Sequence, residues 1–237
     1  MDQLVIMCGG RGKRLKKNIP KALIKINNKT ILEHQLILAK KHKFKKIILL
    51  TGYKSNEIKN FLIKKKLFRN ITILRDKKKL GNGSAILNSI EHLEDHFCLI
   101  YGDILTNLDL SKMRVFFMGA KSDLSLVVNK NSNFQDSNLV TLKKRNLIKN
   151  FYLYPHKKIP KNCYSNEAIF MCKKKIFKIF KKKINNKKID FVKDMISNLS
   201  NNLKIHAYIT REYIIDCGTP ERVREAKLHF KSNKKFY

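Results

Sequence analysis

Residues 4–15, with the sequence LVIMCGGRGKRL, decide the fold of this 237-residue chain. The apolar run at residues 4–8 predicts a short, buried β-strand. Three glycines follow this strand directly: Gly9, Gly10 and Gly12. Glycines let backbone N–H groups approach a phosphate chain, and Arg14 and Lys21 add positive charge nearby. The stretch therefore predicts a strand that ends in a nucleotide-binding loop.

The spacing of these glycines disfavours two common nucleotide-binding motifs. It matches neither the G-x-G-x-x-G of dinucleotide-binding proteins nor the G-x-x-x-x-G-K-[ST] of the P-loop. The alternative is a plain glycine turn between a strand and a helix. The two flanking cations favour the nucleotide-binding interpretation over that turn.

The first half of the chain alternates strand-like and helix-like patterns. Strands are predicted at residues 4–8, 46–51, 71–74 and 97–101, and helices at residues 30–41, 55–67 and 83–91. Thr30 and Glu33 form a capping-box pattern, which marks a helix start. Alternation of this kind predicts βαβ units, so the fold class is α/β with a mostly parallel central sheet.

The second half has a different pattern. Strands are predicted at residues 124–129, 139–143, 148–153 and 168–172, separated by polar stretches, which indicates a smaller, antiparallel lobe. Helices are predicted at residues 173–184 and from Pro220 onward. We expect one domain over residues 1–237, divided into halves at 1–120 and 121–237.

The formal net charge of +34 invites a nucleic-acid interpretation, but the lysines run through every predicted element without clustering. Abundant Lys, Asn and Ile beside absent Trp is typical of codon choice in an AT-rich genome. We therefore expect no nucleic-acid partner and no membrane partner. The five cysteines are scattered without a C-x-x-C pair and predict reduced core residues in a cytoplasmic protein.

The glycine loop and later motifs together resemble the sugar-1-phosphate nucleotidyltransferases, also called NDP-sugar pyrophosphorylases. Six motifs keep the order of that family: Gly9-Gly10-x-Gly12-x-Arg14-Leu15 with Pro20-Lys21, Gly52-Tyr53, Leu80-Gly81-Asn82-Gly83-Ser84-Ala85, Gly102-Asp103, Asn166-Glu167-Ala168-Ile169-Phe170, and Asp216-Cys217-Gly218-Thr219-Pro220. The resemblance covers nearly the whole chain. It implies a Rossmann-like nucleotidyltransferase fold and transfer of a nucleotidyl group from a nucleoside triphosphate to a sugar 1-phosphate, with release of pyrophosphate.

The resemblance also implies roles for residues on the nucleotide side. Asp103 and Asp216 each follow a strand-like run, and strand ends line the ligand crevice of an open parallel sheet. We expect both to be Mg²⁺ ligands, with Mg²⁺ as the cofactor. Arg14 is expected to serve the pyrophosphate and Lys21 the reacting phosphates. The nucleotide-binding residues are expected to be Cys8, Gly9, Gly10, Gly12, Gly52, Gly81, Asn82 and Gly102.

The sugar-phosphate side departs from the family pattern. The family's E-K-P strand appears as Leu153-Tyr154-Pro155, without its lysine. Lys157, Lys158 and Lys193 are the candidates for that contact. Lys193 is the first choice, because Lys193-Asp194 resembles a K-D element of heptose and mannose 1-phosphate members. Asn166 and Asp194 complete the predicted sugar-phosphate site.

Several alternatives remain open from the sequence. GTP with heptose or mannose 1-phosphate, for surface polysaccharide synthesis, is the favoured substrate pair, on the resemblance of Lys193-Asp194 and of residues 216–222. A short connection over residues 15–20 also suits a cytidylyl- or guanylyltransferase that acts on a non-sugar phosphate. A catalytically silent nucleotide-sugar sensor is the alternative from another class, and a homo-oligomer is a further open point.

Overall fold

The structure is a computed structural model that describes residues 1–15, 18–76, 80–130, 134–181, 188–199 and 202–232. The chain forms two compact units, each built from separate stretches of sequence. The first unit contains Met1–Lys79, Leu99–Asp109 and Glu212–Tyr237, and the second contains Leu80–Cys98 and Leu110–Arg211. Strand β6 (His96–Tyr101) begins in the second unit and ends in the first.

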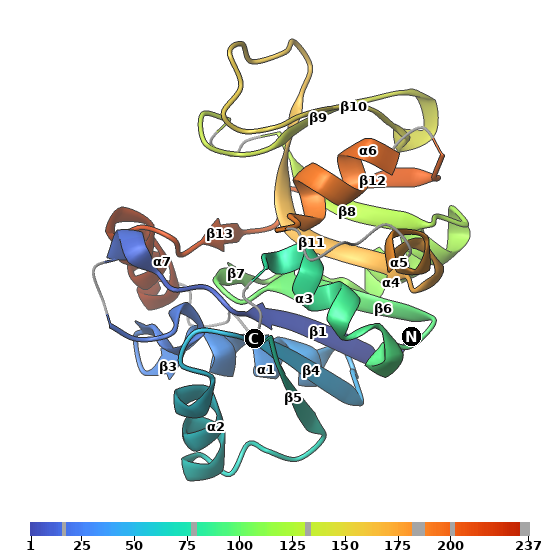
Figure 1. The fold of residues 1–237 in the computed structure, drawn as a ribbon. Coiled ribbons are helices and arrows are strands. Elements are labelled where there is room, and N and C mark those ends of the chain that lie inside the picture. Colours follow the sequence, from blue (N-terminus) through green and yellow to red (C-terminus); the bar gives the residue numbers. More distant parts are fainter. Residues whose placement is uncertain (16–17, 77–79, 131–133, 182–187, 200–201, 233–237) are drawn as a thin grey trace. The chain divides into compact units, whose positions relative to one another are not determined.

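A parallel sheet forms the centre of the first unit (Figure 1). Strand β1 (Gln3–Cys8) pairs with β4 (Lys46–Thr51), and β4 pairs with β5 (Ile71–Arg75). Helix α1 (Ile31–Lys41) precedes β4, and helix α2 (Ser55–Lys64) precedes β5. These two βαβ connections confirm the alternation predicted from the sequence. Smaller elements complete this part of the unit: η1 (Lys13–Leu15), η2 (Lys21–Leu23), β2 (Lys25–Ile26) and β3 (Lys29–Thr30).

A capping box starts helix α1, and a left-handed residue ends helix α2. The Thr30 hydroxyl accepts from the Glu33 N–H at 3.1 Å, and the Glu33 carboxylate accepts from the Thr30 N–H at 2.7 Å, so the predicted capping box is confirmed. Helix α2 ends at Lys64, three residues before the predicted end. Lys66 has a left-handed φ of +55°, and the Leu67 N–H donates to the Leu62 carbonyl at 2.9 Å. This C-terminal cap stops the helix although the apolar pattern continues.

An antiparallel pair corrects one expectation about Asp216. Strand β13 (Ile214–Asp216) pairs antiparallel with β7 (Ile104–Thr106), with Asp216 opposite Ile104. The sequence predicted that Asp216 ends a strand of the parallel sheet. That prediction is wrong, because Asp216 ends a strand of this antiparallel pair. The backbone nevertheless brings it beside Asp103, because the Cys217 N–H donates to the Asp103 carbonyl at 2.8 Å. Helix α7 (Pro220–Ser232) follows, with Pro220 as its first residue as predicted.

The second unit is mostly antiparallel. Strand β11 (Tyr164–Lys173) pairs antiparallel with β8 (Leu124–Asn129) and β9 (Leu139–Leu142), and β9 pairs antiparallel with β10 (Ile148–Tyr152). Strand β12 (Ile205–Ile209) runs parallel to β8. The remaining elements are α3 (Asn82–Asn88), η3 (Ile90–His92), α4 (Leu110–Gly119), η4 (Lys144–Asn146), α5 (Lys175–Lys181), η5 (Phe191–Ile196) and α6 (Ser197–Leu199).

The four strands predicted in this half are present, and β11 begins four residues earlier than expected. Helix α4, which was not predicted, buries Leu110, Met113 and Phe117 at helical spacing. The predicted end of the helix at residues 173–184 lies outside the described residues. The mixed α/β fold class is confirmed. The assignment of the whole chain to one domain with halves at residue 120 stays a prediction.

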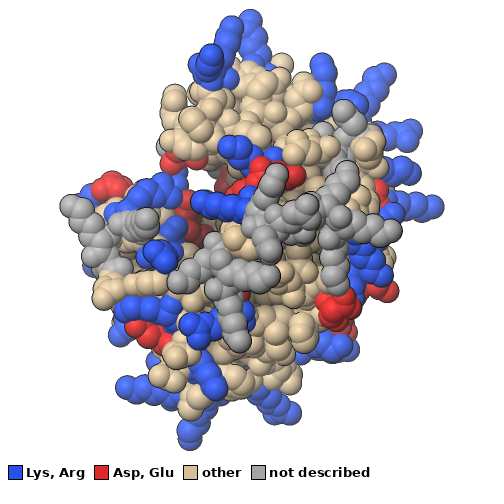
Figure 2. Space-filling model, in the orientation of Figure 1, with Lys and Arg blue, Asp and Glu red and all other residues tan. Residues whose placement is uncertain are grey.

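Lysine and arginine side chains are spread over the face of the molecule seen in Figure 2. Of the helices that the structure describes, none combines the length and the apolar character needed to cross a membrane.

Candidate active site

The carboxyl ends of β1, β4 and β6 lie beside one another in the first unit. Cys8 ends β1, and the loop continues through Gly9 and Gly10, which are exposed, to Gly12, which is buried. A Cβ atom on Gly52, directly after β4, would lie 3.5 Å from Gly9 Cα. The Gly102 N–H, directly after β6, donates to the Met7 carbonyl at 3.1 Å. The predicted nucleotide-binding glycines of the first unit therefore lie together.

Lys21 connects this loop to Asp103. Its side-chain stem packs against the loop, since a Cβ atom on Gly10 would lie 3.5 Å from Lys21 Cδ. Its Nζ atom lies 2.6 Å from Asp103 Oδ2, and the two side chains are 18% and 16% exposed. A nearly buried ion pair of this kind holds both groups in fixed positions. Burial, with a contribution from the Asp103 charge, raises the pKa of Cys8 to about 12, so that thiol stays protonated.

Asp216 lies beside Asp103 with its two oxygens in different environments. Oδ2 accepts from Arg222 Nη1 at 3.2 Å. Oδ1 is buried and has no hydrogen-bond partner among the described residues. Gly218 leaves room for this arrangement, because a Cβ atom there would lie 2.8 Å from Asp216 Oδ1 and 3.0 Å from Arg14 Nη2.

Electrostatics couples these groups. Burial first, and then the charge of Asp103, raises the pKa of Asp216, whereas Lys21, Arg222 and Arg14 act to lower it. Two carboxylates close together in a partly buried place repel each other when both are ionised. A divalent cation would relieve this repulsion and would give the unpartnered Oδ1 a ligand, so the donor set fits Mg²⁺. Mg²⁺ usually takes one or two protein carboxylates beside substrate phosphates, which is what these two residues offer.

Two features of this site were missed in the sequence. Arg222 lies in the first turn of α7, and the signal for it was the helix start at Pro220, which directs that turn back toward Asp216. Tyr53 contacts Asn18, since its hydroxyl donates to Asn18 Oδ1 at 2.6 Å. The Arg11 guanidinium lies 5.7 Å from the centre of the Tyr53 ring. No local sequence pattern pointed to the contacts of Tyr53 with Asn18 and Arg11.

The second unit carries the other predicted residues in three places. Gly81 and Asn82 at the start of α3 contact the segment that leads into η5, where Lys193 and Asp194 lie. The remaining members of the predicted sugar-phosphate site lie elsewhere in the unit: Lys157 and Lys158 in an exposed loop between β10 and β11, and Asn166 within β11.

Strand β11 also shows a departure from the family pattern. Ala168 stands at the Gly position of N-A-G-I-Y, and its φ of +55° is left-handed. The Asn166 side chain accepts from the Ala168 N–H at 3.1 Å, within a stretch where the pairing of β11 with β8 shifts register. The side-chain oxygen of Asn166 thus stabilises this irregular part of the strand.

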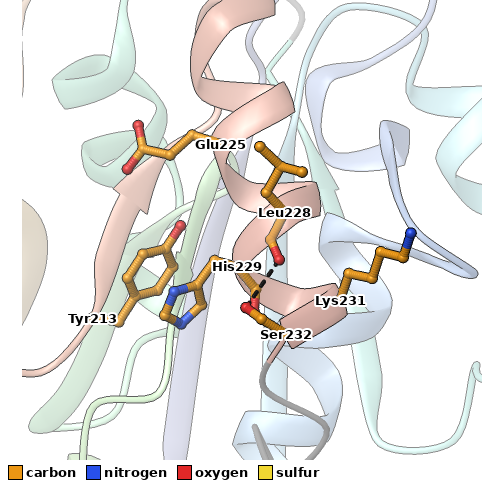
Figure 3. Close-up of a pocket in the computed structure, with 6 residues that line it drawn as sticks. All are labelled: Tyr213, Glu225, Leu228, His229, Lys231 and Ser232. Atoms are coloured by element: carbon orange, nitrogen blue, oxygen red, sulfur yellow. Dashed lines mark hydrogen bonds between the residues drawn. The ribbon is translucent and has the colours of Figure 1, made fainter.

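A pocket of about 710 Å³ lies along α7 in the first unit (Figure 3). The Tyr213 and His229 rings stack with their centroids 3.6 Å apart, and Glu225 and Leu228 also line the pocket. None of its lining residues belongs to the predicted site.

Comparison with known proteins identifies the family. The family described as "Nucleotidyl transferase" matches residues 3–233. The chain is 31% identical over 222 residues to the D-glycero-alpha-D-manno-heptose 1-phosphate guanylyltransferase of Campylobacter jejuni, which covers 92% of this chain and 96% of that protein. It is 26% identical over 238 residues to the protein of the same name from Aneurinibacillus thermoaerophilus, over 95% of this chain and 96% of that protein.

A solved structure agrees with this. The crystal structure of HddC from Yersinia pseudotuberculosis superposes with a TM-score of 0.81 at 25% identity, over 97% of this chain and 100% of that one. The glycine loop, the two carboxylates and the cations around them thus lie in a fold shared with nucleotide-transferring enzymes. The chain belongs to the nucleotidyl transferase family.

Proposed function

We propose that the chain transfers a guanylyl group from GTP to a heptose or mannose 1-phosphate and releases pyrophosphate. The observation that carries this proposal is the position of Asp103 and Asp216, two neighbouring carboxylates flanked by Lys21 and Arg222 beside a glycine loop. The two heptose 1-phosphate guanylyltransferases that match nearly the whole chain support the choice of nucleotide and sugar.

Asp103 and Asp216 would hold the metal ion in this proposal. When bound, Mg²⁺ neutralises charge on the triphosphate and on the pyrophosphate as it leaves. The ion pair of Lys21 with Asp103 supports the assignment, because it places a cation directly beside one of the two carboxylates. Asp103 would hold the metal ion, and the Lys21 ammonium beside it would face the reacting phosphates.

The reaction is an in-line displacement. An oxygen of the sugar phosphate forms a new bond to the α-phosphorus of the nucleotide. The bond from that phosphorus to the bridging oxygen breaks, and pyrophosphate leaves with the electron pair. No protein nucleophile is needed, so the protein contributes by positioning and by neutralising charge.

Each neighbouring group has a proposed place in this step. The N–H groups of the loop at Gly9, Gly10 and Gly12 hold the triphosphate. Lys21 serves the reacting phosphates and Arg14 serves the pyrophosphate. Cys8, Gly52 and Gly102 shape the nucleotide site through their backbone.

The sugar phosphate needs a cation of its own, because it is repelled by the triphosphate. Lys193 is the proposed cation, supported by its exposed side chain at the start of η5 beside Asp194. Lys157, Lys158 and Asn166 are the competing contacts. Five buried free cysteines support a reducing compartment, and we place the activity in the cytoplasm.

A matrix of substrates tests the proposal. Each of the four common nucleoside triphosphates is incubated with a panel of heptose, mannose, glucose and non-sugar phosphates, and pyrophosphate release is measured with Mg²⁺ present. We expect turnover with GTP and heptose or mannose 1-phosphate, and loss of turnover in Asp103→Asn and Asp216→Asn with folding retained. Either variant within about tenfold of the unsubstituted protein, ~1.4 kcal/mol in barrier, would contradict its role as a metal ligand.

The same matrix separates the alternatives. Turnover confined to a non-sugar phosphate would identify the chain as a cytidylyl- or guanylyltransferase that does not act on sugar phosphates. Nucleotide-sugar binding without turnover for any pair would identify a silent sensor.

A further inference from the structure

The side chain of Asn82 bridges two segments that are far apart in the sequence. Its Nδ2 atom donates to Asp190 Oδ2 at 3.0 Å, and its Oδ1 atom accepts from the Phe191 N–H at 2.7 Å. The opposite demands of a carboxylate and an N–H group fix the orientation of the amide. The family pattern L-G-T-G-x-A has threonine at this position. Its side chain carries a single hydroxyl in place of the separate NH₂ donor and oxygen acceptor of asparagine.

Backbone contacts reinforce this bridge on both sides. The Ile189 N–H donates to the Leu80 carbonyl at 2.7 Å, and the Gly83 N–H donates to the Ile189 carbonyl at 3.0 Å. The Phe191 ring is fully buried and packs on Phe170 with ring centroids 5.1 Å apart. The loop at residues 80–85 is therefore held to the start of η5 by four hydrogen bonds, and the buried Phe191 ring anchors the same start of η5 against β11.

Asp190 passes this restraint on to Lys193. Its Oδ1 atom accepts from the N–H groups of Val192 and Lys193, at 3.0 and 2.9 Å, and so caps the first turn of η5. Its own N–H donates to Asp194 Oδ2 at 2.7 Å. Because Asn82 holds the other oxygen of Asp190, the orientation of the cap depends on Asn82.

We propose that Asn82 is a positioning residue for the sugar-phosphate site. Its amide sets the geometry of the turn that carries Lys193, so the loop at residues 80–85 and the segment at residues 189–194 are held together within the second unit. This gives the Asn82 side chain a role other than the nucleotide contact predicted from the motif. The inference rests on the proposed function, in which residues 193 and 194 meet the sugar phosphate.

Exchanging the two polar groups tests the bridge. Asn82→Asp places a carboxylate against the carboxylate of Asp190. In Asp190→Asn the amide oxygen stays with the N–H groups that cap η5, so the new NH₂ group faces the NH₂ group of Asn82. Each single substitution therefore breaks the contact between the two side chains. The double substitution restores it, because the new carboxylate at position 82 accepts from both the Phe191 N–H and the new amide at position 190. The new amide oxygen at position 190 still accepts from the N–H groups that cap η5. Asn88→Asp, at the exposed end of the same helix, is the matched control.

Steady-state kinetics and binding give the first readout. We expect the Michaelis constant for the sugar phosphate to rise about tenfold in Asn82→Asp, the effect of one lost charge-assisted hydrogen bond, with the GTP dissociation constant nearly unchanged. The double variant should recover most of this loss, and Asn88→Asp should behave like the unsubstituted protein. Weakened GTP binding with an unchanged sugar-phosphate constant, or a double variant no better than the singles, overturns the inference.

Hydrogen exchange gives a readout that needs no substrate. Amides of residues 189–194 should exchange faster in Asn82→Asp and regain protection in the double variant, and equal exchange in all variants overturns the inference. If Asn82→Asp does not fold, Asn82→Ser is measured in its place. An unsubstituted protein without turnover on the whole substrate panel refutes the proposed function, whereas the exchange result still decides the bridge.

Discussion

Gly81→Ala should destabilise the second unit strongly. Gly81 has φ +98° and ψ 172°, a region of backbone space that is almost confined to glycine. An added Cβ atom would lie 2.4 Å from the Ile189 carbonyl oxygen and 3.1 Å from its carbonyl carbon. Neither atom is the end of a flexible side chain, so the backbone itself must move.

The magnitude follows from two contributions. An alanine in that backbone region costs roughly 1–3 kcal/mol. Moving Ile189 away breaks its hydrogen bonds to the Leu80 carbonyl and from the Gly83 N–H, and each contributes about 1 kcal/mol. The free energy of unfolding should therefore fall by roughly 3–5 kcal/mol.

Urea unfolding followed by circular dichroism measures this loss. Gly119→Ala is the matched control in the same unit, because a Cβ atom there meets nothing within 4 Å and Gly119 ends helix α4. It should leave stability unchanged or raise it by up to about 1 kcal/mol. If Gly81→Ala loses less than about 1 kcal/mol relative to this control, the close approach of Ile189 does not constrain the loop.

Three further changes test other parts of the molecule. Lys193→Met should raise the Michaelis constant for the sugar phosphate and lower kcat while GTP affinity stays nearly constant, and the same defect in Lys157→Met instead would move the contact to the loop. Arg222→Met removes the partner of Asp216 Oδ2 and should weaken Mg²⁺ binding about 10–100-fold, as titration calorimetry with GTP present can measure, whereas Arg224→Met on the exposed side of α7 should not. Burial alone would raise the pKa of Asp123, but hydrogen bonds from Lys175 and the Lys204 N–H, with nearby lysine charges, outweigh burial and lower it. Asp123 therefore stabilises the fold above the pKa of an unfolded aspartate, and that stability is lost as pH falls through the lowered folded pKa. Asp123→Asn should cost about 1 kcal/mol at pH 7 and progressively less in urea unfolding at acid pH, and a pH-independent cost would contradict the ion pairs.

Much of the fold follows from local signals in the sequence. The capping box at Thr30 and the apolar runs of β1 and β4 depend only on neighbouring residues, so they were predicted to within a residue. The end of α2 was set by a left-handed residue that carries no strong sequence signal, since lysine rarely adopts that conformation. Helix α4 was missed although its buried residues have helical spacing.

In the candidate site too, contacts between residues close in the sequence were predictable and contacts between distant residues were not. Gly12 and Lys21 lie close together in the sequence, and their proximity was predictable. The contact of Asn82 with Asp190 spans 108 residues and depends on how two segments pack, so no local pattern could show it. Asp216 reached its predicted neighbour by an antiparallel pair instead of the parallel sheet.

The burial of all five thiols has a practical consequence for spectroscopy. Cys8, Cys98, Cys163, Cys172 and Cys217 are free and buried. Burial raises the pKa of Cys8 and Cys98 to about 12, and alkylating reagents attack the thiolate form. A cysteine introduced at an exposed position should therefore react with a maleimide dye long before the native ones. Fluorescent labels on the two units would then report their relative motion in the native-cysteine protein.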